Sequence, residues 1–167
     1  MKPQTRAENE RMTASDENEM LRTLRAEADI RRVLIAYATT VDTRDWETFD
    51  QVFSESARAV YGSDPSFQFV CEDRDEITQM CRANLDGCGP TQHLITNFQI
   101  DVSGGQARSI CSVQAGHFGQ GDARDKRYEM WGEYRDDWVE GPDGWRIVKR
   151  ELHVIHDFGD RDQVLGA

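Results

Sequence analysis

The chain has 167 residues, enough for one ordinary domain with a single well-buried core. It carries 31 acidic against 20 basic residues, a net charge of −11, which argues against binding to nucleic acids or anionic membrane surfaces. No apolar run approaches the ~20 residues that a membrane-spanning helix needs. The polar N-terminus does not resemble a signal peptide, so we expect a cytoplasmic protein.

The four cysteines, Cys71, Cys81, Cys88 and Cys111, show no C-x-x-C pair and no zinc-like spacing. In a cytosolic chain, the expectation is reduced and mostly buried thiols. Neither a structural metal nor a disulfide framework is therefore predicted.

The first part of the chain predicts a charged tail and then a long helix. Residues 1–14 mix charges without an apolar period, which is typical of a disordered tail. Ser15, which is followed by two acidic residues, is a suitable helix start. Apolar residues then recur with helical spacing and predict one long helix, or a helix pair, that ends at about Thr40. The predicted buried face consists of Met20, Leu21, Leu24, Ala28, Ile30, Val33, Leu34, Tyr37, Ala38 and Val41.

Two polar residues stand near the end of this helix. Asp42 would face the negative end of the helix dipole, which costs roughly 0.3–1 kcal/mol. It either belongs to the turn and caps the next element, or it is held there for chemistry. Tyr37 is either a core residue with a solvated hydroxyl or a second functional group.

The middle of the chain predicts short elements. Asp45 is the expected N-cap of a second helix whose inner side carries Trp46, Phe49, Val52 and Phe53. Strands are predicted at 57–61 and 67–70, a third helix at 73–85, and a break at 86–90.

The second half predicts four long antiparallel strands. Residues 92–102 alternate, and the remaining strands are expected at 107–118, 127–139 and 145–158. Helices followed by such a meander indicate an α+β fold with the helices on one face of a curved sheet. We expect a single domain at 15–158 and a C-terminal tail at 159–167. In the strand at 92–102, one face is predicted to carry Leu94, Thr96, Phe98, Ile100 and Val102. The other face is predicted to carry His93, Ile95 and Asn97.

Three segments, in this order and spacing, resemble the nuclear transport factor two-like superfamily and, within it, the SnoaL-like branch. They are IRRVLIAYATTVDTRDWETFDQVF, TQHLITN at the start of a long strand, and DGWRIVKRELHV on the last strand. The resemblance covers about residues 20–158. It implies a cone-shaped α+β barrel, in which a strongly curved, mainly antiparallel sheet wraps long N-terminal helices and leaves a deep apolar pocket.

The resemblance also implies a set of catalytic residues. In lyase members, an Asp at the end of the first long helix pairs with a His after the third helix, which matches Asp42 and His93. A Tyr of bile-acid 7α-dehydratase matches Tyr37, and an Arg of the dehydrochlorinase matches Arg150. A second His of scytalone dehydratase falls near His117. Members with other chemistry lack parts of this set, so the fold alone is poor evidence for an activity.

These residue types suit proton transfer. A carboxylate that fixes the tautomer of an imidazole makes it an effective base at neutral pH. Tyr37 would donate to a developing enolate, Arg150 would stabilise anionic charge, and His117 could protonate a leaving hydroxyl. The candidate substrate-binding residues are Asn97, Tyr61, Phe53 and Trp131.

Structural interpretations of the same residues stay open. His93 could be a satisfied histidine at a strand start. Arg150 could form a cross-strand ion pair with a neighbouring acid. His117 precedes a glycine-rich loop and could be structural.

The predicted function is that of a cofactor-independent lyase or isomerase of the dehydratase or cyclase type. Its substrate would be a hydrophobic, carbonyl-bearing small molecule such as a polyketide, terpenoid or aromatic intermediate, and no cofactor or metal is required. The alternative is a non-catalytic binder or assembly subunit, similar to the β subunit of aromatic-ring dioxygenases. Epoxide hydrolysis, a third chemistry of this fold, uses a residue set that this chain matches less well. The resemblance also implies an exposed aromatic sheet face that usually pairs with another copy, so we expect a homodimer or homotrimer.

Overall fold

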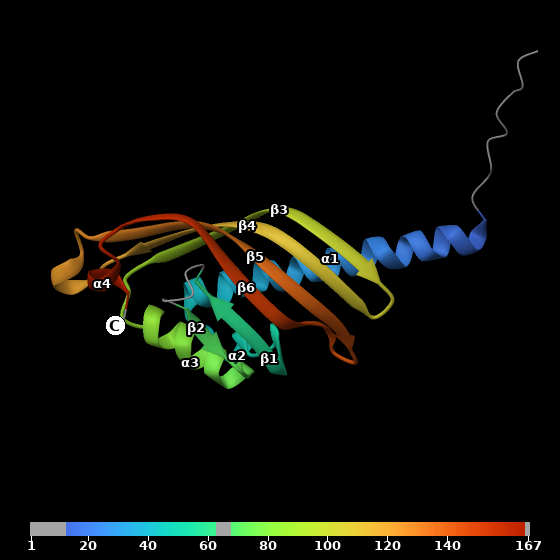
Figure 1. The fold of residues 1–167 in the computed structure, drawn as a ribbon, viewed down its shortest axis with the longest axis horizontal. Coiled ribbons are helices and arrows are strands. Elements are labelled where there is room, and N and C mark those ends of the chain that lie inside the picture. Colours follow the sequence, from blue (N-terminus) through green and yellow to red (C-terminus); the bar gives the residue numbers. More distant parts are fainter. Residues whose placement is uncertain (1–12, 63–67, 166–167) are drawn as a thin grey trace, which may run out of the picture.

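The protein was analysed as a computed structural model that describes residues 13–62 and 68–165. Within these residues, a long helix lies under a curved six-stranded sheet, and shorter helices pack beside the sheet (Figure 1). The helices are α1 (Ala14–Thr43), α2 (Trp46–Phe49), α3 (Arg74–Leu85) and α4 (Arg161–Val164), with a 3₁₀ turn at Gly121–Ala123. The strands are β1 (Phe53–Tyr61), β2 (Phe69–Cys71), β3 (Thr91–Ser103), β4 (Gln106–Phe118), β5 (Arg127–Gly141) and β6 (Gly144–Gly159).

The strand order is β2-β1-β6-β5-β4-β3, and every neighbouring pair is antiparallel except the parallel pair β1 and β6. The predicted α+β class with a mainly antiparallel, curved sheet is confirmed. The sheet is open, with β2 and β3 as its two edges, so it forms a cone rather than a closed barrel. None of the described helices combines the length and apolar character that crossing a membrane requires.

The long helix begins at a capping box. The Thr13 hydroxyl accepts from the Asp16 N–H, and the Asp16 carboxylate accepts from the Thr13 N–H. The predicted inner face is confirmed from Ile30 onward. Met20, Leu21 and Leu24 are half exposed or more, so the first part of the predicted face is wrong. The reason is that the N-terminal turns of α1 project beyond the sheet, where no described element covers them (Figure 1).

The second helix is shorter than predicted, although Asp45 caps it as expected by accepting from the Thr48 N–H. Val52 and Phe53 are buried, but Phe53 already opens β1. The Val52 carbonyl accepts from the Ile147 N–H of β6. Pairing with a long strand therefore holds this segment extended, against its helical spacing.

Strand β3 departs from simple alternation at a bulge. Thr96 lies opposite Ser112, but Gln99 lies opposite Ile110, so β3 carries one extra residue between them. Asn97 takes up the insertion in the left-handed region, with φ 55°. Odd-numbered residues face the helices before the bulge and even-numbered ones after it. The predicted face that grouped Leu94 and Thr96 with Phe98 is therefore wrong, and Leu94 is 48% exposed.

The predicted terminal segments differ from the structure where it describes them. Strand β6 continues to Gly159, and α4 follows with Val164 buried. The Cys88 thiol donates to the Val164 carbonyl at 3.0 Å. Part of the predicted C-terminal tail therefore packs on the domain. Residues 1–12 of the predicted N-terminal tail, 63–67 of the predicted loop and short strand, and 166–167 lie outside the described residues.

Candidate active site

A cavity of about 480 Å³ lies between the inner face of the sheet and the helices, a size that suits a small organic ligand. Its wall is mainly apolar, as predicted for a deep pocket. Apolar parts of the wall come from Met80, Leu85, Met130, Leu152, Val154 and Leu165, and phenol or imidazole groups come from Tyr37, Tyr61, His93, His117, Tyr128, Tyr134 and His156.

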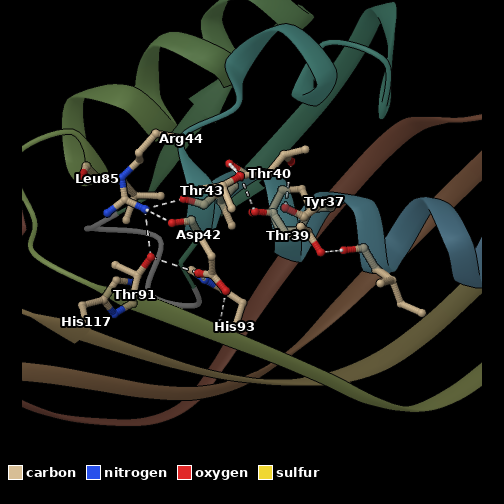
Figure 2. Close-up of polar contacts among 12 residues, drawn as sticks. Tyr37, Thr39, Thr40, Asp42, Thr43, Arg44, Leu85, Thr91, His93 and His117 are labelled. Carbon is tan, nitrogen blue, oxygen red and sulfur yellow. Dashed lines mark hydrogen bonds and ion pairs between the residues drawn. The ribbon is translucent and has the colours of Figure 1, made fainter.

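Asp42 and His93 meet at this wall (Figure 2). The His93 Nδ1 lies 2.7 Å from Asp42 Oδ1, and the His93 backbone N–H donates to Asp42 Oδ2 at 2.8 Å. The Thr91 hydroxyl donates to Asp42 Oδ1 at 2.9 Å. Asp42 lies within the last turn of α1 rather than in the following turn. These three hydrogen bonds offset the unfavourable helix dipole at that position.

The hydrogen bonds also set the protonation of the pair. Burial by itself raises the pKa of Asp42, but the bonds and charge of His93, together with the Thr91 bond, outweigh burial and lower it. Asp42 is therefore a carboxylate at neutral pH and can only accept. The His93 Nδ1 must then carry the hydrogen, which leaves the Nε2 of this pocket-lining ring as the basic atom.

His117 lies beside this pair but in a different protonation environment. Its ring centre is 5.4 Å from that of His93, and the two rings are nearly perpendicular. Its Nδ1 lies 3.3 Å from the Tyr128 carbonyl, which can only accept, so Nδ1 donates and Nε2 is free to accept. Burial, helped by the nearby His93, lowers the pKa of His117 to about 4. A neutral ring does not suit the acid role that the sequence predicts.

Two buried phenols that line the cavity lie close to each other. The Tyr37 and Tyr134 hydroxyl oxygens are 3.4 Å apart. Burial raises the pKa of both groups well above the ordinary range, so both stay protonated and can donate. Tyr61 lines the same cavity, as expected from the sequence.

Arg150 lies behind the pocket wall rather than in it. Its side chain is fully buried, and its Nε and Nη2 each donate to Asp136 at 2.8 Å. The guanidinium lies between two aromatic rings, 4.2 Å from the centre of Tyr37 and 4.1 Å from that of Tyr134. The cross-strand ion pair is thus present, and Arg150 reaches the cavity only through these rings.

Three candidate substrate-binding residues lie outside the cavity wall. Phe53 is a core residue, packed edge-on against Tyr37. Trp131 points to the outer face of the sheet, where it stacks on His156 and Phe158. Asn97 is exposed at the bulge and donates to Ser112. These three assignments are corrected, because burial beneath the wall and the direction of the strand face keep the side chains out of the cavity.

The structure adds residues that the sequence did not single out. Thr91 lies two residues before His93 and shares its strand face, a spacing that could have revealed it. Tyr134 could have been found by the alternation of β5. Arg44 contacts Thr91 at 2.8 Å and follows the helix end, but no pattern in the sequence marks it. Among the described residues, no cluster of three or more His, Cys, Asp or Glu side chains could hold a metal ion.

Comparison with known proteins identifies the family. A family described as the SnoaL-like domain matches residues 22–151, most of the chain. The chain therefore belongs to the SnoaL-like family, as its sequence resemblance predicts. An uncharacterised protein of Mycobacterium tuberculosis is 29% identical over 127 residues, which is 73% of this chain and 80% of the relative.

Solved structures share the fold at low sequence identity. A candidate scytalone dehydratase from Novosphingobium aromaticivorans has a TM-score of 0.73 at 22% identity, covering 90% of this chain and 95% of that one. A candidate aromatic ring hydroxylase from the same organism has a TM-score of 0.73 at 21% identity, with 84% and 96% covered. A hexachlorocyclohexane dehydrochlorinase of type 2 has a TM-score of 0.66 at 13% identity, with 87% and 94% covered.

Proposed function

We propose that this protein is a lyase or isomerase that removes a proton next to the carbonyl group of a hydrophobic small molecule without a cofactor. The observation that carries the proposal is the 2.7 Å contact between His93 Nδ1 and an ionised Asp42 on the wall of a mainly apolar cavity. The structural likeness to a candidate scytalone dehydratase and to a dehydrochlorinase supports the same class of chemistry.

In the proposed reaction, His93 Nε2 takes the proton from the carbon beside the carbonyl. The C–H electron pair forms the enolate, whose oxygen accepts a hydrogen bond from Tyr37. When the carbonyl re-forms, the electrons form a carbon–carbon double bond and expel the β-substituent. The His93 imidazolium, stabilised by Asp42, returns its proton to a leaving hydroxide and gives water. In an isomerisation, the proton returns to another carbon instead.

His117 has a different proposed role in this scheme. Because it is neutral and its Nε2 can accept, it would receive a hydrogen bond from a substrate hydroxyl rather than donate a proton. A β-hydroxy carbonyl compound has such a hydroxyl at the position of the leaving group. Dehydration is therefore the form of the reaction that uses both His93 and His117.

The experiment measures proton exchange in D₂O with a panel of cyclic ketones and β-hydroxy ketones by ¹H NMR. The native protein should exchange the hydrogen beside the carbonyl or release water. Asp42→Asn should lower the rate by about 10²–10⁴-fold, because the amide no longer stabilises the imidazolium. His93→Gln should lower it at least as much. His153→Gln, a change at a half-buried histidine outside the cavity wall, is the matched control. Native-like rates in both site variants would exclude the proposal.

A non-catalytic binding or assembly role is the second candidate. It is supported by apolar side chains exposed on the outer face of the sheet, among them Leu94, Phe118 and Phe158. The same surface supports the proposed homodimer or homotrimer. Light scattering coupled to size exclusion distinguishes a monomer from either assembly. If the protein is a monomer, the proposal that this face forms a homodimer or homotrimer is wrong.

A further inference from the structure

Arg44 adopts a backbone conformation that is unfavourable for its residue type. It is the C-cap of α1 and has φ 60°, in the left-handed region. Glycine or asparagine usually occupies this region at helix ends. For other L-residues the conformation is unfavourable, because Cβ approaches the following carbonyl oxygen. The contacts of the Arg44 side chain therefore have to offset this cost.

Those contacts join three segments around the Asp42–His93 pair (Figure 2). The guanidinium donates to the Val41 carbonyl at the end of α1 and to the Leu85 carbonyl at the end of α3, the latter at 3.0 Å. It also donates to the Gly89 carbonyl at 3.3 Å and to the Thr91 hydroxyl oxygen at 2.8 Å. The last contact reaches the start of β3, two residues before His93.

The contact with Thr91 fixes the direction of a hydrogen-bond chain. A guanidinium can donate but never accept, so the Thr91 oxygen must accept from Arg44. The single hydroxyl hydrogen of Thr91 is then directed to Asp42 Oδ1, 2.9 Å away. Asp42 accepts at both oxygens and receives the Nδ1 hydrogen of His93. In this series of hydrogen bonds, Arg44 donates to Thr91, and Thr91 and His93 both donate to the Asp42 carboxylate.

We propose that Arg44 is a positioning residue that acts through Thr91: it directs the Thr91 hydroxyl onto Asp42 and so keeps this carboxylate ionised and aligned with His93. The catalytic consequence rests on the proposed function, but the effect on Asp42 does not. Among the residues that the structure describes, the charged or titratable groups that face Asp42 are Arg44 from the end of α1, His93 from β3 and His117 from β4.

The primary test follows the ¹³C signal of the Asp42 carboxyl group against pH in the protein without ligand. Thr91→Val keeps the shape of the side chain but removes the hydroxyl, and the carboxyl should titrate at a higher pH than in the native protein. Thr91→Ser keeps the hydroxyl and should restore native behaviour. Thr96→Val, an outward-facing change on the same strand, is the matched control. An unchanged titration in Thr91→Val would overturn the proposal.

A double-mutant comparison tests whether Arg44 acts through Thr91. Arg44→Gly removes the guanidinium and suits the positive φ, so the fold should persist. It should shift the Asp42 titration upward, and Arg44→Gly combined with Thr91→Val should shift it no further than Thr91→Val alone. Additive shifts would overturn the proposed route. If Arg44→Gly does not fold, Arg44→Met takes its place in the same comparison.

The functional readout is separate. Because residues that orient a catalytic group typically contribute 10–100-fold, Thr91→Val should lower the ketone exchange rate by about that factor. Thr91→Ser should recover the rate. A shifted Asp42 titration without any ketone exchange in the native protein would exclude the proposed function and leave the positioning role intact.

Discussion

His93 and His117 both line the cavity but differ in what their Nδ1 atoms contact. For His93 the contact is an ionised carboxylate, which stabilises the imidazolium after proton abstraction. For His117 it is a backbone carbonyl, which orients the ring but adds no full charge. Burial then keeps His117 neutral. The environment of each ring therefore divides the roles of base and hydrogen-bond acceptor between them.

The lowered pKa of His117 predicts a loss of stability in mild acid. The pKa is about 4 in the folded protein against 6.5 for the free side chain, so the unfolded chain binds the extra proton between these values. The free energy of unfolding should therefore fall as the pH drops from about 6.5 to 4. The contribution is roughly 3 kcal/mol at most. Urea denaturation at several pH values measures it.

A variant isolates this contribution. His117→Gln removes the titrating ring and should flatten the decline of stability between about pH 6.5 and 4. His153→Gln, at a half-buried histidine outside the cavity wall, serves as the control and should leave the decline in place. An unaltered slope in His117→Gln would mean that another group controls the acid sensitivity.

At the level of single elements, the bulge in β3 places the proposed base in the cavity. Without the extra residue, His93 and Phe98 would lie on opposite faces of the strand, because side chains alternate. With it, both His93 and the later residues Phe98, Ile100 and Val102 face the helices. The insertion thus lets one strand contribute both a site residue and core residues.

Asn97 should tolerate glycine but not a β-branched residue. Asn97→Gly suits φ 55°, so the unfolding free energy should change little. Asn97→Val should cost about 1–2 kcal/mol, because a β-branched side chain clashes in the left-handed region. Urea denaturation compares the two variants. Equal stability of both variants would show that the extra residue of β3 can move to another position in the strand.

Across the whole molecule, the buried Arg150–Asp136 pair ties the long helix to the centre of the sheet. The pair joins β6 to β5, and the guanidinium packs on Tyr37 of α1. Because Asp136 balances its charge, Arg150 supports the cavity wall without adding net charge to it.

Breaking this pair should be costly, whereas replacing both partners should not. Arg150→Met leaves Asp136 buried without its partner and should lower the unfolding free energy by about 3–5 kcal/mol. Arg150→Met combined with Asp136→Leu removes both charges and should recover much of that loss. Thermal and urea denaturation of the three proteins form the measurement. A double variant no more stable than Arg150→Met would contradict this account.

The sequence was sufficient for elements whose signals lie within a few residues. The helical period predicted the buried face of α1 from Ile30 onward, and Asp45 marks a helix start by its side-chain cap. The resemblance to the SnoaL-like branch supplied the pairing of Asp42 with His93. It could do so because that pairing follows from the order of elements, which the three matched segments preserve.

Contacts between distant segments required the three-dimensional structure. The partner of Arg150, the face change at Asn97 and the link from Arg44 through Thr91 depend on strand register and packing. No local period encodes these, because one inserted residue reverses a strand face without altering the composition of the strand. Which side chains line the cavity likewise depends on strand register and packing. Composition and local pattern therefore establish most of the helices and strands, whereas packing decides which polar groups meet around the cavity and which lie behind its wall.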